Sequence, residues 1–370
     1  MPNQNSLTTR VEDYIKRVLP DAHGHQQKAV SAFVAALLVT QSCVQAVLAR
    51  CFDNFEAASR RLTRLLHNQL LEPEALAQAH AAALVAQLPG SGVVRLMLDW
   101  TSEGTQHLLV ASLLIGRRAL PLYWSAYAAG ELKDRTKQLE RAFTLTLVAR
   151  VCGTLCRRRL LLLADRGWAD VEFFAQLDEL GVAFIIRTKA SLKVRWQGDW
   201  RRLETLRWAG NQRCRALGRL WYNASDPRRY FICQSRARNK KGAWGIWHLV
   251  SNRPLTAQLC AAEYARRMAG EQGFRDAKTL LGFRTAQVAD LQAWSRLFTL
   301  VALALSLLYA VAMRWLAQPQ WAGWLRQLTS RRRQRREVSL VHATLRLLCK
   351  EPVFLDWLMQ PVNLNLEAHL

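Results

Sequence analysis

Acidic residues are scarce in this sequence. Its 370 residues include 28 Asp and Glu against 52 Lys and Arg, which gives a formal net charge of +24. Because 51% of the residues are hydrophobic, this charge does not indicate a disordered basic tail. We expect a folded chain of two or three domains that meets a polyanion, with nucleic acid ahead of an anionic membrane surface.

The usual cysteine patterns are also missing. The eight cysteines are scattered, and none forms C-x-x-C or a Cys/His set with zinc spacing. This argues against a zinc finger, and free thiols in a reducing cytoplasm are expected. The chain opens without the charged, apolar and cleavage regions of a secretory signal, so we expect none.

Long apolar runs are rare as well. One such run, within residues 297–317, holds about 17 uncharged residues, which is the lower limit for crossing a bilayer. It directly follows a charged segment and has no second apolar run as a partner. We predict a buried core helix, with a membrane-associated protein as the alternative.

Two short apolar runs each end in an aspartate. Residues 93–102 read VVRLMLDWTS and end in Asp99 and its polar neighbours, and residues 159–168 read RLLLLADRGW with Asp165 in the same place. Runs of this length predict buried strands, and a carboxylate at the end of such a strand lies where a cleft can form. A helix N-cap is a credible alternative role for Asp165 and a weaker one for Asp99.

The order of the predicted elements indicates the fold class. Three strands from residue 93 onwards precede a helix (134–158), a strand (160–165), a helix (170–180) and a strand (182–187). This is the order of an α/β, ribonuclease-H-like domain, in which the first and fourth strands are neighbours. The two aspartates would then come together, and two or three carboxylates around two metal ions are the minimum for in-line displacement at a phosphodiester.

Four residues in the C-terminal third form the pattern Y-x2-R-x3-E-x6-K, namely Tyr264, Arg267, Glu271 and Lys278. On one α-helix, offsets of four and seven place these side chains on one stripe, with a carboxylate between a phenol and two cations. Such a stripe suits a helix that lies along a phosphate backbone, with the carboxylate on a metal ion and its neighbours on phosphates. A solvated helix face with chance ion pairs is the alternative.

Together the three motifs resemble the DDE transposases of bacterial insertion sequences, specifically the "insertion sequence four" family with its Y-R-E-K signature. Asp99 in DWTS resembles the first catalytic aspartate of that family, and Asp165 in ADRGW resembles the second. The resemblance covers about residues 90–290. It implies a cut-and-paste enzyme of a mobile element, in which Asp99, Asp165 and Glu271 bind two Mg²⁺ or Mn²⁺ ions.

The resemblance also implies the partners and the location. Tyr264, Arg267 and Lys278 would grip double-stranded DNA, both the transposon end repeats and the target, and a homodimer would join two ends in the bacterial cytoplasm without a membrane. Gly270 and Gly273 depart from the family, whose positions around the glutamate are often apolar or bulky. Because each glycine costs a helix about 1 kcal/mol relative to alanine, we expect a kinked or closely approached helix.

The 106 residues from Asp165 to Glu271 exceed what one strand and one helix need, and the resemblance explains the surplus as a β-rich insertion domain. Residues 187–241 hold 16 Lys and Arg and only three acidic residues, interleaved with Trp196, Trp200, Trp208, Trp221 and Tyr222. Aromatic rings among cations predict a nucleic-acid groove, with a solvated basic surface as the alternative. By resemblance to hairpin-forming members, Trp247 would stack on a flipped base, and Trp244 is the second candidate for this role. The alternative, which fits the sequence equally well, is that Trp247 is a core residue.

The remaining segments complete the predicted organisation. Residues 1–90 read as helical, and the resemblance implies a domain that binds terminal repeats, with Arg50, Arg60, Arg61 and Arg64 on phosphates or with a packing role only. We predict five parts, which are a helical N-terminal domain (1–90), the first part of the core (91–187), a β-rich basic insertion (188–255), core completion (256–317) and a helical, basic C-terminal region (318–370). The basic run at 330–337 is either a tether or a DNA contact.

Two other functions fit the same motifs. One is a domesticated DDE nuclease that cuts DNA but no longer mobilises it. The other is a non-catalytic DNA-binding derivative, which is less suitable because three carboxylates in a cationic groove would weaken phosphate binding.

Overall fold

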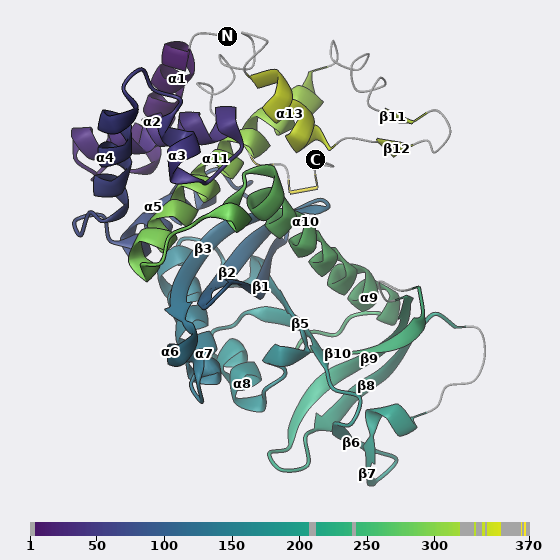
Figure 1. The fold of residues 1–370 in the computed structure, drawn as a ribbon. Helices are drawn as coiled ribbons and strands as arrows, with labels where there is room; N and C mark the ends of the chain where they lie inside the picture. The colour runs from purple at the N-terminus through teal and green to yellow at the C-terminus, as the bar shows by residue number, and fades with distance from the viewer. Residues whose placement is uncertain are drawn as a thin grey trace. The chain divides into compact units, whose positions relative to one another are not determined.

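The computed structural model describes residues 4–206, 212–238, 242–318, 329–330, 335–336, 339–348, 364 and 366–367 (Figure 1). The chain forms two compact units. The first unit comprises residues 1–90, 100–131 and 269–370, and the second comprises residues 91–99 and 132–268. Trp208 and most of the predicted C-terminal region, including most of its basic run, lie outside the described residues.

The first unit contains the predicted N-terminal helices, which are confirmed. Its elements are α1 (Gln4–Val18), α2 (Gly24–Thr40), α3 (Gln45–Ala49), α4 (Phe55–Leu66), α5 (Pro73–Val85), β2 (Gln106–Ile115), β3 (Arg118–Ala128), α10 (Ala269–Arg275), α11 (Leu291–Ala317), β11 (Thr329–Ser330), β12 (Arg335–Arg336) and α13 (Leu340–Leu348). Strands β2 and β3 pair antiparallel, and α5, α10 and α11 contact β3. Helix α6 (Ala129–Leu132) lies at the boundary of the units.

Helix α11 is the core helix of the first unit. Asp290 caps its start by accepting a hydrogen bond from the backbone N–H of Ala293. By length and composition alone the helix could cross a membrane, but 94% of its apolar window is buried. It contacts α2, α4, α5 and α13, and Figure 1 shows it passing among the N-terminal helices. The predicted buried helix is therefore confirmed.

The second unit is built around one mixed sheet. Its elements are the first part of β1 (Val94–Glu103), α7 (Thr136–Thr146), β4 (Leu160–Ala164), α8 (Val171–Glu179), β5 (Ala183–Thr188), β6 (Lys193–Trp196), β7 (Asp199–Arg202), β8 (Cys214–Tyr222), β9 (Arg228–Arg238), β10 (Trp244–Ser251) and α9 (Ala257–Ala265). Within this unit the strand order is β1-β4-β5-β10-β9-β8-β6-β7. The pairs β1–β4 and β4–β5 are parallel, and the later pairs are antiparallel.

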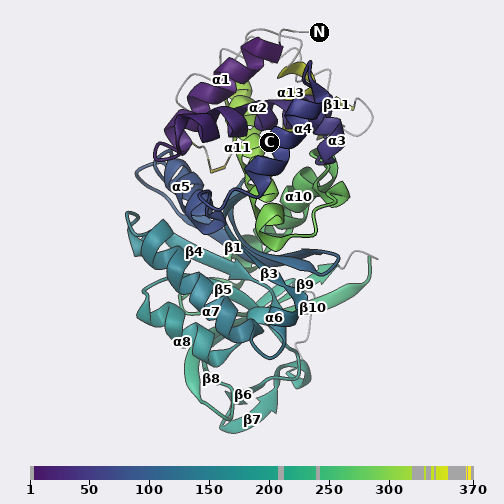
Figure 2. The same cartoon turned by 60° about the vertical axis from the view of Figure 1, so that its left-hand side comes forward.

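Strands β6–β10, which cover the predicted insertion, extend the core sheet. Phe174 of α8 stacks on Phe184 of β5 with ring centroids 4.8 Å apart, and it also contacts Tyr222 and Tyr230 from β8 and β9. Figure 2 shows α7 and α8 against β4 and β5. One aromatic core thus joins the parallel and antiparallel parts of the sheet.

The predicted helix over residues 134–158 is shorter in the structure. The α-helix α7 ends at Thr146 and continues only as a π-helical turn, Leu147–Val151, before irregular backbone around Gly153. Glycine weakens a helix because it loses more backbone freedom on folding than other residues do, which fits this early end.

Candidate active site

The two aspartates of the apolar runs belong to neighbouring strands. Strands β1 and β4 are parallel, and their register pairs Leu98 with Ala164, the residues directly before Asp99 and Asp165. Asp165 follows the end of β4, as predicted, but Asp99 lies inside β1, so the prediction that it ends its strand is wrong, because the polar residues after it continue the extended backbone to Glu103. Their side chains are 31% and 37% exposed, which leaves the carboxylates accessible to solvent. The prediction that these two strands are neighbours is confirmed.

One guanidinium lies at both carboxylates. Arg267 Nη2 is 3.1 Å from Asp99 Oδ2, with which it forms a hydrogen bond, and 3.9 Å from Asp165 Oδ2. The Arg267 side chain is only 13% exposed, and its residue belongs to a 3₁₀ turn, Arg266–Met268, that directly follows α9. The two carboxylates are therefore close enough to share one cation.

Tyr264 contacts the second aspartate. Its hydroxyl donates a hydrogen bond to Asp165 Oδ1 at 3.3 Å, and Arg187 Nη1 lies 4.0 Å from the same oxygen. Burial raises the pKa of Tyr264 above its ordinary value, and the Asp165 carboxylate raises it further, against the opposing charges of Arg267 and Arg187. The phenol consequently stays protonated at neutral pH and can act as a hydrogen-bond donor.

Helix α9 is fastened to β1 by an ion pair that the sequence did not reveal. Arg95 Nε and Nη2 donate to the two carboxylate oxygens of Glu263, at 2.5 and 2.8 Å, and both side chains are 12% exposed. Glu263 immediately precedes Tyr264 in the chain. The pair joins residues 168 apart in sequence, so no local pattern indicates it.

Trp247 lies beside the tyrosine of the site. Its ring packs edge-on against Tyr264, with centroids 5.0 Å apart and an interplanar angle of 76°. Trp244, in contrast, is 61% exposed, and the guanidinium of Arg238 lies 4.8 Å from its ring centroid. The ring connected to the site is therefore that of Trp247.

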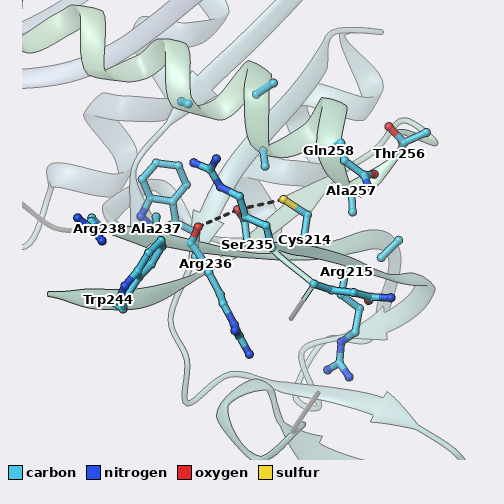
Figure 3. A pocket seen from close by; sticks show the side chains of 17 residues that line it. Cys214, Arg215, Ser235, Arg236, Ala237, Arg238, Trp244, Thr256, Ala257 and Gln258 are labelled. Atoms are coloured by element: carbon cyan, nitrogen blue, oxygen red, sulfur yellow. Dashed lines mark hydrogen bonds between the residues drawn. The ribbon is translucent and has the colours of Figure 1, made fainter. Parts of the chain in front are cut away.

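A groove of about 1290 Å³ runs between α9 and strands β8–β10 (Figure 3). The described residues that line it include four arginines and two tryptophans, and none of them is acidic. They are Gln212, Arg213, Cys214, Arg215, Ala216, Ser235, Arg236, Ala237, Arg238, Trp244, Trp247, Thr256, Ala257, Gln258, Ala261, Ala262 and Ala265. In Figure 3 Trp244 and Arg236 point away from α9. Trp247 pairs with Ser235, which also pairs with Cys214 on the next strand, and the side chains of Ser235 and Cys214 meet at 3.4 Å.

Glu271 and Lys278 belong to the first unit. Glu271 is an exposed residue of α10, and Lys278 lies in a π-helical turn, Asp276–Leu280, that follows this helix. Lys278 Nζ donates to the backbone oxygen of Ser102 at 3.0 Å and is 2.7 Å from Glu103 Oε1. Lys278 is thus held at the end of β1.

The predicted single helix is divided in the structure. The segment from Tyr264 to Lys278 passes through α9, a 3₁₀ turn, α10 and a π-helical turn, and the boundary between the two units follows Met268. Offsets of four and seven therefore do not by themselves place the four signature residues on one stripe, because the rise and turn per residue change along the segment.

The two aspartates suit a hard divalent cation. Carboxylate oxygens are the ligands that Mg²⁺ and Mn²⁺ prefer, and Asp99 and Asp165 already share the charge of Arg267. Across the residues that the structure describes, no three His, Cys, Asp or Glu side chains are grouped as metal ligands. The donor chemistry of the two aspartates fits the implied ions, and Glu271 stays a predicted third ligand.

Comparison with known families gives one match. Residues 133–307 match the family model described as the transposase DDE domain, and this range includes Asp165 and Glu271 but begins after Asp99. The search of curated proteins found no match. The mixed α/β architecture is consistent with such a domain. The family match supports a DDE transposase.

Proposed function

We propose that this chain is a cut-and-paste transposase of the "insertion sequence four" type, which cleaves and transfers the ends of an insertion-sequence DNA. The observation that carries the proposal is that Asp99 and Asp165 directly follow a paired position, Leu98 and Ala164, of two neighbouring parallel strands and share one guanidinium. In this proposal β1–β5 with α7 and α8 form a ribonuclease-H-like core, and the predicted five-part division of the chain is retained.

The proposed ligands of two Mg²⁺ or Mn²⁺ ions are Asp99, Asp165 and Glu271. When bound, two such ions supply activation of the attacking oxygen and charge stabilisation of the leaving oxygen. In the first cut a water oxygen forms a bond to phosphorus, the P–O3′ bond breaks, and the 3′ oxygen takes up a proton. In strand transfer the resulting 3′ oxygen loses its proton and forms a bond to a phosphorus of the target DNA, while the P–O3′ bond of the target breaks and its 3′ oxygen takes up a proton.

The chain's other site residues hold the phosphates. Arg267 would bind an oxygen of the phosphate that is cut, because it already lies at Asp99. Its delocalised charge matches phosphate oxygens. The protonated Tyr264 can donate to a phosphate oxygen in place of Asp165. Lys278 would hold a flanking phosphate as a point charge.

The proposed partner is double-stranded DNA, as end repeats and as target, bound by a homodimer in the cytoplasm. Arg50, Arg60 and Arg64 of the N-terminal helical region are exposed and suit backbone phosphates. Arg61 is partly engaged, because its Nη2 donates to the backbone oxygen of Lys28 at 2.9 Å. Trp247 would stack on an extruded base, which is supported by its place between the groove and Tyr264.

The test is an excision assay with the DNA that flanks the gene. A plasmid carrying a marker between the two flanking segments is combined with expression of the chain, and excised product and marker inserted at new sites are both counted. We expect excision and insertion with the natural chain and neither with Asp165→Asn. Asp226→Asn, which alters an exposed ion pair with Arg228, is the matched control and should behave like the natural chain.

The outcomes separate the alternatives. Excision without insertion would identify the domesticated nuclease. Specific binding to the flanking DNA, with neither excision nor insertion by the natural chain and an intact fold, would identify a non-catalytic DNA-binding protein and contradict the proposal.

A further inference from the structure

Helix α10, which carries Glu271, meets the backbone of β3 at an unusually close approach. A Cβ atom added to Gly273 would overlap the carbonyl oxygen of Ala119 and would stand 3.0 Å from the Cβ of Ala119. No side chain fits there without moving helix or strand. The glycine that disfavours a helix by itself is therefore required by the packing of this helix.

Three residues after Gly273, a buried carboxylate binds the neighbouring residue of the same strand. Arg118 Nη1 donates to both oxygens of Asp276, at 2.9 and 2.8 Å, and the two side chains are 12% and 8% exposed. The hydroxyl of Tyr309, on the core helix α11, donates to Asp276 Oδ2 at 3.1 Å. Asp276 is thus tied to both β3 and α11.

The two anchoring positions share one face of the α10 segment, and Glu271 has a different direction. Gly273 is packed against Ala119 and Asp276 binds Arg118, so both residues face β3. Glu271 precedes Gly273 by two residues, about 200° around the helix, and it is exposed where Gly273 is buried. The contacts of Gly273 and Asp276 therefore fix both the rotation and the depth of the helix that presents Glu271.

We propose that Gly273 and Asp276, with Arg118 and Tyr309, form a positioning anchor that fixes the rotation and depth of the helix that presents Glu271 as a metal ligand. The proposal rests on the proposed function, because it takes Glu271 as a metal ligand. Catalytic side chains must be held within about 0.5 Å of the productive geometry, and loss of a supporting contact typically costs 10- to 100-fold in metal affinity or activity.

The stability of the fold does not by itself require this buried ion pair. Burial raises the pKa of the Asp276 carboxyl, against the favourable effect of Arg118 and the hydrogen bond from Tyr309. A buried ion pair of this kind is weak evidence for added stability, because an apolar replacement is often as stable. Its directional hydrogen bonds, in contrast, define one position for the helix, which an apolar contact would define less strictly.

The experiment compares Asp276→Asn and Tyr309→Phe with a matched control in the same unit. Arg296, on α11, is also buried and donates to the backbone oxygens of Leu71 and Leu66 at 2.6 and 2.8 Å, so Arg296→Met removes a comparable buried polar contact away from α10. Each full-length variant is examined for thermal unfolding, for Mn²⁺ affinity by electron paramagnetic resonance, and for cleavage of flanking DNA. Amide hydrogen exchange of residues 269–275 is measured on the metal-free protein.

We expect the variants to differ in which properties they lose. Asp276→Asn should weaken Mn²⁺ binding and slow cleavage, each about 10- to 100-fold, and should speed hydrogen exchange in residues 269–275. Tyr309→Phe should do the same to a smaller extent. Arg296→Met should lower the melting temperature at least as much, with Mn²⁺ affinity, cleavage and α10 exchange close to natural.

Two results would overturn the anchor. One is Asp276→Asn with natural Mn²⁺ affinity and natural exchange of α10. The other is Arg296→Met showing the same losses, which would mean that any destabilisation of the unit disturbs the site. The failure of the anchor and the failure of the proposed function give different results. If the natural chain cleaves no DNA, but Asp276→Asn still speeds hydrogen exchange in α10 and Arg296→Met does not, the proposed function fails and the structural anchor stands. If Glu271→Gln abolishes cleavage, but Asp276→Asn behaves like the natural chain in all measurements, the function stands and the anchor fails.

Discussion

Arg267 and Asp99 are joined across 168 residues of sequence by a hydrogen bond of 3.1 Å, and the same Arg267 nitrogen lies 3.9 Å from Asp165. The arginine of the signature therefore sits at the aspartates of two other motifs. Three patterns that are far apart in the sequence converge in one unit of the structure.

The first prediction concerns this arginine. Arg267→Ala should weaken binding to cleaved DNA ends and reduce the slope of log affinity against log salt by about 0.9, the release associated with one phosphate contact. Lys278→Ala should have the same effect. Arg267→Lys retains the charge and is the control, with a nearly natural slope. Affinity is measured by fluorescence anisotropy over a series of salt concentrations. Natural slopes in both alanine variants would contradict the phosphate contacts and favour the alternative of a solvated helix face.

The second prediction concerns Trp247. If cleavage passes through a DNA hairpin, Trp247→Ala should slow the hairpin step about tenfold or more, from about 1.4 kcal/mol of lost stacking, and leave first-strand nicking nearly intact. Trp244→Ala is the control, because that ring points away from α9 and should affect the hairpin step less. Timed gels of nicked and hairpin products give both rates. Because Trp247 also packs on Tyr264, equal loss of both steps would assign it a core role instead.

The third prediction concerns the ion pair between Arg95 and Glu263. Glu263→Gln should destabilise the fold by about 3 kcal/mol, because it removes the carboxylate that the largely buried Arg95 guanidinium binds at two nitrogens. The double variant Arg95→Met/Glu263→Gln should recover part of this loss. Asp199→Asn, from an exposed pair with Arg201, should change stability by less than about 1 kcal/mol. Urea unfolding measures the natural chain, both single variants Arg95→Met and Glu263→Gln, the double variant and Asp199→Asn. A double variant as unstable as the sum of its single changes would contradict the coupling.

The fourth prediction concerns pH. Burial, with the nearby charge of Arg187, lowers the pKa of His248 to about 4, and the ring nitrogen Nδ1 lies 3.1 Å from Gln234 Nε2. Because the unfolded chain takes up this proton near pH 6.5 and the folded chain only near 4, His248 contributes stability above about pH 6.5 that is lost as the pH falls towards 4. In urea unfolding between pH 4 and 7.5, the free energy of unfolding of His248→Gln should depend less steeply on pH than that of the natural chain. Equal pH dependence in the two proteins would contradict the shift.

Much of the fold was predictable because its elements have strong local signals. The apolar runs that end in Asp99 and Asp165 are short and bounded by polar residues, and they form the neighbouring strands that the element order implied. The apolar run at 297–317 is buried, as expected from its continuity with a charged segment and the lack of a second run.

The rest of the site depends on contacts that no local pattern contains. Periodicity assumes a regular helix, so it could not reveal the 3₁₀ and π-helical turns on either side of α10. In the sequence Gly273 indicates only a weak helix former, since its close neighbour Ala119 is distant in sequence. Arg118 and Arg95, which bind Asp276 and Glu263 through both carboxylate oxygens, are likewise more than 150 residues away in sequence.

The most direct test of the central claim is cleavage of linear DNA carrying the flanking ends, in Mg²⁺, by the natural chain and by Asp99→Ala, Asp165→Ala and Glu271→Ala, with end binding measured in parallel. Each carboxylate offers oxygen ligands that its neighbours cannot replace geometrically. We expect all three variants to bind the ends and none of them to cut. Cutting at the natural rate by Asp165→Ala in Mg²⁺ would contradict it.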